Sequence, residues 1–107
     1  MTDPVRPDQI DAIIHERARL AIVSALAVSA EMTFNELRDT LGLSDGNLSA
    51  HAQKLEDAGY IRIIKSFQGK RPLTQMRLTL KGRRAFDRYL DTLKRIVDQG
   101  DTGAAGS

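Results

Sequence analysis

The stretch that decides the fold is LSAHAQKLEDAGYI, residues 48–61. Leu48, Ala52 and Leu55 recur at helical spacing, so the segment predicts a short amphipathic helix with an apolar inward face. Gly59 ends this helix, because glycine readily adopts the left-handed conformation found at helix C-termini. The chain then runs directly into a strand that begins at Tyr60. Few large side chains stand on the polar face of the helix.

A second helix precedes this one after a short turn. Thr33-Phe34-Asn35-Glu36 has the spacing of a capping box, in which the first and last side chains each satisfy a backbone amide. We therefore expect a helix that starts at Thr33 and is ended by Gly42. Ser44 supplies the next N-cap, and the following helix is predicted over residues 44–58. Two helices joined in this way are typical of a helix-turn-helix.

A basic hairpin follows. Tyr60–Phe67 is rich in isoleucine and Thr74–Leu78 alternates in polarity, so the two runs predict a pair of antiparallel strands. Residues 66–73 form the tip, or wing, of this hairpin. The order of elements predicts a winged helix-turn-helix, a mainly α fold with a small β-hairpin, which places one helix in a DNA groove and a loop beside it.

Helices are expected at both ends of the domain. An apolar stripe predicts a first helix that starts near Asp8, and Thr79 caps a last helix from about Leu80 to Val97. The winged-helix domain then covers residues 8–98, between a flexible N-terminus at 1–7 and a disordered tail at 99–107.

Composition excludes several classes of function. The chain has 107 residues, which predicts one domain, and it has no cysteine for a disulfide or a thiolate metal site. We expect no metal, cofactor or catalytic site, because the two histidines are far apart and no Gly-rich phosphate loop is present. No apolar run is long enough for a membrane span, so the cytoplasm is the expected compartment.

The net charge of +2 conceals a strong asymmetry along the chain. Residues 1–60 carry five Arg or Lys against ten Asp or Glu, whereas residues 61–88 carry nine against one. A basic block on an otherwise acidic chain fits a surface that faces nucleic acid, and it fits a solvated face that pairs with the acidic half equally well.

The candidate DNA contacts lie on the polar face of the 44–58 helix and at the wing. Asn47 and Gln53 have the paired donor and acceptor that read adenine in the major groove, and small residues beside them allow the backbone to approach closely. Lys70 and Arg71 would point outward from the hairpin tip toward the minor groove. The bland alternative is an ordinary solvated face and turn. The predicted set is Ser44, Gly46, Asn47, Ser49, Ala50, Gln53, Lys54, Lys70 and Arg71.

The terminal helices carry more apolar residues than one side of a helix needs. This surplus predicts a homodimer whose interface uses the first and last helices, although both helices could instead complete the core of a monomer. The predicted interface residues are Ile10, Ile13, Ile14, Tyr89, Leu90, Leu93, Ile96 and Val97.

These motifs together resemble a known family. The run Gly46-Asn47-Leu48-Ser49, the Gly69-Lys70-Arg71-Pro72 tip and Gly82-Arg83 in the last helix are similar to the small winged-helix transcriptional regulators of the MarR and ArsR groups, over roughly Arg17 to Leu93. The resemblance implies a homodimer that binds double-stranded operator DNA, and it identifies no small-molecule effector. Without cysteine, the chain departs from the metal-sensing ArsR members. A winged-helix protein-interaction module that does not bind DNA is the alternative.

Overall fold

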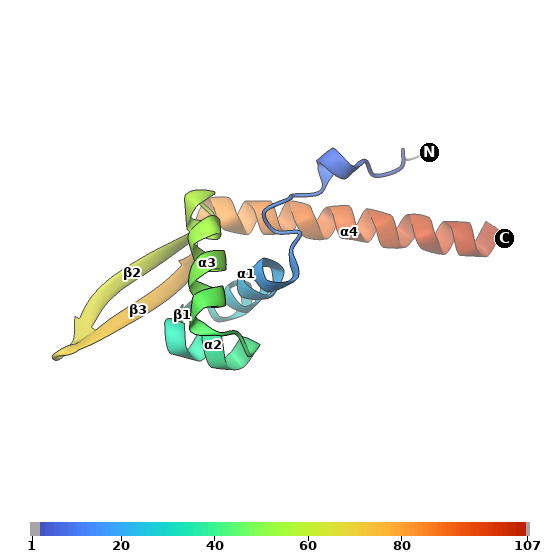
Figure 1. Ribbon diagram of the computed structural model, residues 1–107. Coiled ribbons are helices and arrows are strands. Elements are labelled where there is room, and N and C mark those ends of the chain that lie inside the picture. Colours follow the sequence, from blue (N-terminus) through green and yellow to red (C-terminus); the bar gives the residue numbers. More distant parts are fainter. Residues whose placement is uncertain (1–2, 107) are drawn as a thin grey trace.

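A computed structural model describes the backbone of residues 3–106 and the side chains up to Gly100. A short 3-10 helix, η1, covers Pro7–Gln9, and the α-helices are α1 (Arg17–Ser29), α2 (Phe34–Leu41), α3 (Asp45–Asp57) and α4 (Leu80–Gly106). The strands are β1 (Glu31–Thr33), β2 (Ile61–Gln68) and β3 (Arg71–Leu78). In Figure 1 the hairpin of β2 and β3 projects from one end of the helical body and α4 projects from the other. The predicted mainly α winged-helix fold is confirmed.

The helix-turn-helix forms as its capping residues predict. Thr33 Oγ1 accepts a hydrogen bond from the Glu36 amide at 3.1 Å, and Gly42 ends α2 in the left-handed conformation. Ser44 Oγ accepts from the Asn47 amide at 3.1 Å and caps α3. Leu37, Leu48, Ala52 and Leu55 are fully buried, so the apolar faces of both helices meet in the core.

The first helix begins later than predicted. The prediction of a start near Asp8 is wrong, because α1 begins only at Arg17. Asp11 Oδ1 accepts hydrogen bonds from the amides of Ile13 and Ile14, at 2.9 and 3.0 Å, and so holds a turn in place of a helix. Glu16 then caps α1 by accepting from the Arg19 amide at 2.9 Å.

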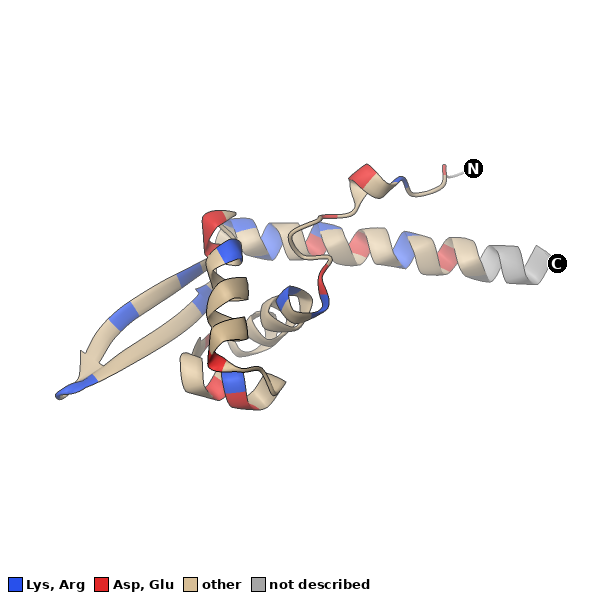
Figure 2. Ribbon diagram, in the orientation of Figure 1, with Lys and Arg blue, Asp and Glu red and all other residues tan. Residues whose placement is uncertain are grey.

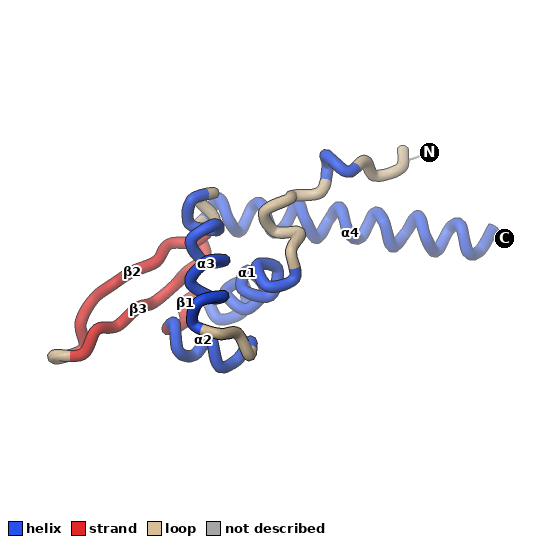
Figure 3. The backbone as a smooth tube through the Cα atoms, in the orientation of Figure 1, coloured by secondary structure: helices blue, strands red, loops and turns tan. Residues whose placement is uncertain are grey.

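The hairpin belongs to a larger antiparallel sheet with the strand order β1-β3-β2 in the described part of the chain (Figure 3). Strand β1 was not predicted, because three residues are too few to show an alternating pattern. It pairs Met32 with Met76 of β3. Strands β2 and β3 pair over their full length, from Ile61 opposite Leu78 to Gln68 opposite Arg71. Only Gly69 and Lys70 connect them, and Gly69 has a φ of 65°, as a tight two-residue hairpin loop requires. The wing is therefore a long ribbon.

The last helix continues beyond its predicted end. Thr79 caps α4 as expected, since its Oγ1 accepts from the Gly82 amide at 3.0 Å. The helix does not stop at Val97, as predicted, but continues to Gly106. An established helix adds residues at little further cost, so polar sequence can extend it. Ser107 lies outside the described residues, as do Met1 and Thr2 of the predicted flexible N-terminus.

The N-terminal segment runs beside α4 (Figure 1), and Gln99 Nε2 donates a hydrogen bond to the Asp3 carbonyl at 2.8 Å. The molecule measures 63 × 24 × 21 Å, an elongated shape that follows from the projecting hairpin and α4. Within the described residues, no helix combines the length and apolar character that a membrane crossing would need.

Candidate nucleic-acid interface

The predicted contact residues of α3 all lie on its exposed side. Ser44, Gly46, Asn47, Ser49, Ala50, Gln53 and Lys54 are exposed. Adding a Cβ at Gly46 would meet no atom within 4 Å, so the helix surface is open at this position. The first two turns of α3 thus present small and polar groups to the outside, which is the geometry a recognition helix needs.

An acidic residue at the start of α3 is balanced by a cation. Asp45 favours the helix N-terminus but would repel a phosphate. Arg38 of α2 donates from Nη1 to Asp45 Oδ1 and from Nε to Asp39 Oδ1, both at 2.9 Å. These two carboxylates hold the pKa of Arg38 above its ordinary value. The pairing offsets the charge of Asp45 beside the candidate DNA surface.

The polar side chains in the C-terminal part of α3 form hydrogen bonds within the protein. Gln53 Nε2 donates to Asp57 Oδ1 at 2.9 Å, and Glu56 Oε2 accepts from the Ile63 amide of β2 at 2.8 Å. To contact a base through Nε2, Gln53 must therefore give up its hydrogen bond to Asp57. The N-terminal turns are the better placed part of α3 for contact with an anionic polymer.

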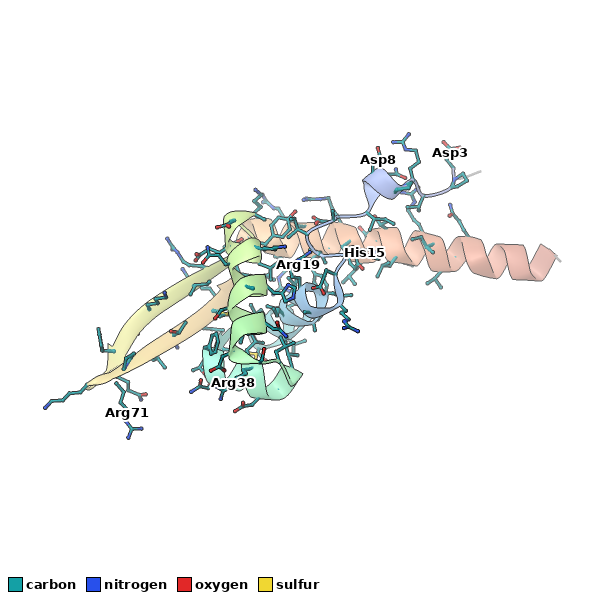
Figure 4. The ribbon with its side chains drawn as sticks, viewed as in Figure 1. Asp3, Asp8, His15, Arg19, Arg38 and Arg71 are labelled. Carbon is teal, nitrogen blue, oxygen red and sulfur yellow. The ribbon has the colours of Figure 1, made fainter. Side chains whose placement is uncertain are left out.

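A buried polar group fixes α3 against α1. Arg19, which is 9% exposed, donates from Nε to the Ile13 carbonyl at 2.6 Å, and its Nη1 lies 3.1 Å from His51 Nδ1. Because a guanidinium only donates, His51 Nδ1 accepts in this contact. Figure 4 shows Arg19 between α1 and α3. The half-buried His51 is thus held between α1 and α3 by its contact with Arg19.

The same cluster lowers the pKa of Glu16, mainly through the hydrogen bond from the Arg19 amide. His51 Nδ1 lies 3.6 Å from Glu16 Oε2, and the carboxylate also faces the positive charge of Arg19. These groups join the start of α1 to the middle of α3, so the exposed turns of α3 stand on a rigid support.

A groove of about 380 Å³ runs between α3 and the hairpin. Ser49 and Gln53 line it from α3, and Lys65 and Thr74 line it from β2 and β3. The exposed side of α3 and one face of the wing therefore share a continuous surface, which we call the reading face. A ligand that spans this groove touches both elements.

The tip of the wing is cationic and far from the body. Lys70 and Arg71 are exposed, and Arg71 lies at the distal end of the hairpin in Figure 4. Basic segments continue along the hairpin and into the start of α4 (Figure 2). The positive charge of residues 61–88 is thus spread along the projecting hairpin and the adjoining helix α4.

The predicted dimer residues divide into three groups by exposure. Ile14 and Tyr89, at 0% and 3% exposed, pack in the core of the single chain and offer no surface to a second copy. Leu90, Ile96 and Val97 are 44%, 40% and 59% exposed along α4. Ile10, Ile13 and Leu93 are partly buried against the core.

No group of three or more His, Asp or Glu side chains within the described residues is placed to hold a metal ion. His15 lies instead against α4, where its Nδ1 is 2.9 Å from the Tyr89 hydroxyl.

Comparison with known proteins identifies the family. The family described as "Winged helix DNA-binding domain" matches residues 18–97. The chain belongs to this family. An uncharacterized protein of Methanocaldococcus jannaschii is 37% identical to this winged-helix chain over 78 residues, which is 73% of this chain and 85% of the relative. The predicted resemblance to small winged-helix regulators is confirmed.

Solved structures agree with the family assignment. A transcriptional regulator homologue from Pyrococcus horikoshii is 30% identical, with a TM-score of 0.79 over 83% of this winged-helix chain and 88% of that one. A putative transcriptional regulator of the MarR family from Enterococcus faecalis shares the fold, with a TM-score of 0.67 at 20% identity over 89% and 82% of the two chains.

Two features of the reading face were missed from the sequence. The pairing of Arg38 with Asp45 joins two helices and has no local signal. Phe67 was placed in the strand and the wing without a role of its own, yet it is 73% exposed there. Its position two residues after Lys65 places it on the face that lines the groove, since alternate residues of a strand share a face.

Proposed function

We propose that this winged-helix protein is a transcriptional regulator that binds specific double-stranded DNA as a homodimer, with α3 in the major groove and the wing at the minor groove. The observation that carries the proposal is the reading face, on which the open side of α3 and one face of the cationic hairpin border the same groove. An α-helix fills the major groove, and a basic loop beside it reaches the adjacent minor groove.

Each residue of the proposed site has a distinct role. Asn47 and Gln53 read adenine, Ser49 contacts a base edge, and Gly46 and Ala50 allow the helix backbone to approach the DNA closely. Ser44 and Lys54 contact the phosphate backbone. Lys70 and Arg71 enter the minor groove, where A·T sequences concentrate negative potential.

A second copy would double this surface through the exposed apolar side of α4. Leu90, Leu93, Ile96 and Val97 recur near 3.5-residue spacing, which suits helix pairing. Two recognition helices would then reach successive major grooves, about 34 Å apart, and favour an approximate palindrome.

Titration of duplex DNA at several salt concentrations tests the proposal. We expect affinity to fall steeply with salt, because cations on the protein displace counterions from phosphates. Lys70→Ala with Arg71→Ala should weaken binding to all sequences and lower the salt slope by about 2, about 1 for each cation. Asn47→Ala should relax base preference and leave the salt slope unchanged.

Arg17→Ala is the matched control, since it removes an exposed cation from the start of α1, outside the reading face and outside the proposed contact along α4. It should keep the wild-type affinity and slope. A wild-type protein that binds no duplex at low salt would refute the proposal and favour a protein-interaction module.

A further inference from the structure

The wing carries an apolar pair that the fold itself does not use. Phe67 is 73% exposed, and Pro72 lies directly opposite it on β3 and is also exposed. The buried residues of the hairpin lie at its other end, where Ile61 and Met76 are 2% and 1% exposed. A large aromatic side chain held beyond the core gains free energy when a partner covers it.

The side of the hairpin on which this pair stands follows from the strand register. Ile63 and Lys65 line the groove beside α3, and Phe67 is the next residue on that face. The register gives Lys65 opposite Thr74 and Phe67 opposite Pro72. The reading face therefore continues outward from the groove to the apolar pair of Phe67 and Pro72, and it ends at the tip.

Cations surround the apolar pair. Lys65 precedes it on the same face, and Lys70 and Arg71 follow at the tip, all of them exposed. A flat apolar ring among cations suits a partner that is anionic outside and apolar inside. The minor groove of duplex DNA has this character, since phosphates line its edges while sugars and stacked bases form its walls and floor.

Resting on the proposed DNA binding, we propose that Phe67, supported by Pro72, is an apolar wedge that enters the minor groove, opens a base step and bends the duplex. Proteins that use phenylalanine or proline in this way kink the duplex toward the major groove. Flexible pyrimidine–purine steps such as TA open easily, whereas AA steps within an A-tract are stiff. The wedge therefore selects between two sequences of the same base composition.

Paired duplexes test this inference. Each carries a site selected from random duplexes for binding to the wild type, with a TA step or an AA step at the position that footprinting assigns to the wing. Energy transfer between dyes at the two ends reports the bend. The wild type should bind the TA duplex more tightly and bend it. Phe67→Ala should bind about tenfold more weakly, because the buried surface of the ring is lost. It should also lose both the bend and the TA preference, while its salt slope stays unchanged.

Two further variants make the comparison specific. Phe67→Leu keeps apolar bulk and should retain part of the bend. Val28→Ala trims an apolar side chain of α1 that is 87% exposed, and it should match the wild type in every measurement. Because Phe67 is mostly exposed, its variants should fold, and circular dichroism verifies this.

The possible failures are distinguishable. If Phe67→Ala binds with an unchanged bend and TA preference, the wedge is refuted while DNA binding stands. If Phe67→Ala changes the sedimenting mass, Phe67 contacts another copy of the chain and the wedge is again refuted. If the wild type binds no duplex at low salt, the proposed function fails before the wedge is tested.

Discussion

Gly82 determines how closely α4 approaches the end of α3. A Cβ at this position would collide with the backbone carbonyl of Tyr60, which also accepts a hydrogen bond from the Thr79 amide at 3.0 Å. Gly82→Ala must therefore displace backbone, and we expect it to lower the free energy of unfolding by about 1–3 kcal/mol. Urea denaturation measures the change.

Gly46→Ala is the matched comparison, because the same substitution in α3 meets no atom within 4 Å. It should raise the free energy of unfolding by about 0.5–1 kcal/mol, since alanine favours a helix over glycine. The added methyl should nevertheless weaken DNA binding, where the proposed site needs close backbone approach. A Gly82→Ala protein as stable as the wild type would contradict the assigned packing.

Tyr60 gives the fold a dependence on alkaline pH. Burial, followed by the hydrogen bond from its hydroxyl to Asp11 Oδ2 at 2.5 Å, raises the pKa of Tyr60 from 10.0 to about 12. The neutral phenol is thus favoured in the folded state. Its contribution to stability is complete below pH 10, the ordinary pKa, and is lost as pH rises toward 12.

Tyr60→Phe isolates this effect. The variant should be about 1 kcal/mol less stable than the wild type near pH 8, because it lacks the hydrogen bond to Asp11. The difference should shrink above pH 10, because the phenol ionises there in the unfolded state before it ionises in the folded state. Denaturation curves of both proteins across this range measure it, and a difference that is constant with pH would contradict the shifted pKa.

At the scale of elements, the N-cap of α3 stabilises the helix-turn-helix. Ser44 Oγ accepts the Asn47 amide, so Ser44→Ala should lower the free energy of unfolding by about 1 kcal/mol. Ser66→Ala, an exposed serine of β2, should change it by less than about 0.5 kcal/mol. Thermal unfolding compares the two variants. Equal melting temperatures would show that the cap contributes nothing.

Capping residues explain why the helix-turn-helix could be predicted. Thr33, Gly42, Ser44 and Gly59 act through neighbours a few residues away, so their effect is visible in the sequence. Asp11 also acts locally, but its turn lies within an apolar stripe that imitates a helix, and the start of α1 was placed too early. Strand β1 exists because it pairs with β3, more than 40 residues later in the chain, and no local pattern reveals such a partner.

At the scale of the whole molecule, the relation of α3 to the wing depends on how the sheet packs. The sequence predicted which residues α3 and the tip would expose, but their common groove arises from contacts among α3, β2 and β3. For the terminal helices, a stripe pattern could not separate core from surface, so Tyr89 and Leu90 were grouped although one is 3% exposed and the other 44%.

The projecting α4 connects this geometry to assembly. Leu90→Glu with Val97→Glu places charges on two exposed positions of its apolar stripe, at 44% and 59% exposure. If a second copy covers this stripe, burial of unpaired carboxylates opposes association, and the variant should sediment as a single chain where the wild type is a dimer. Binding to a palindromic duplex should fall toward that of one half-site, because the two reading faces are no longer linked.

Val28→Glu is the control, because it adds a charge at an exposed apolar position of α1 and should leave mass and affinity unchanged. A double variant that stays dimeric would place the contact between copies on another surface, and the half-site spacing would then have to follow from that surface.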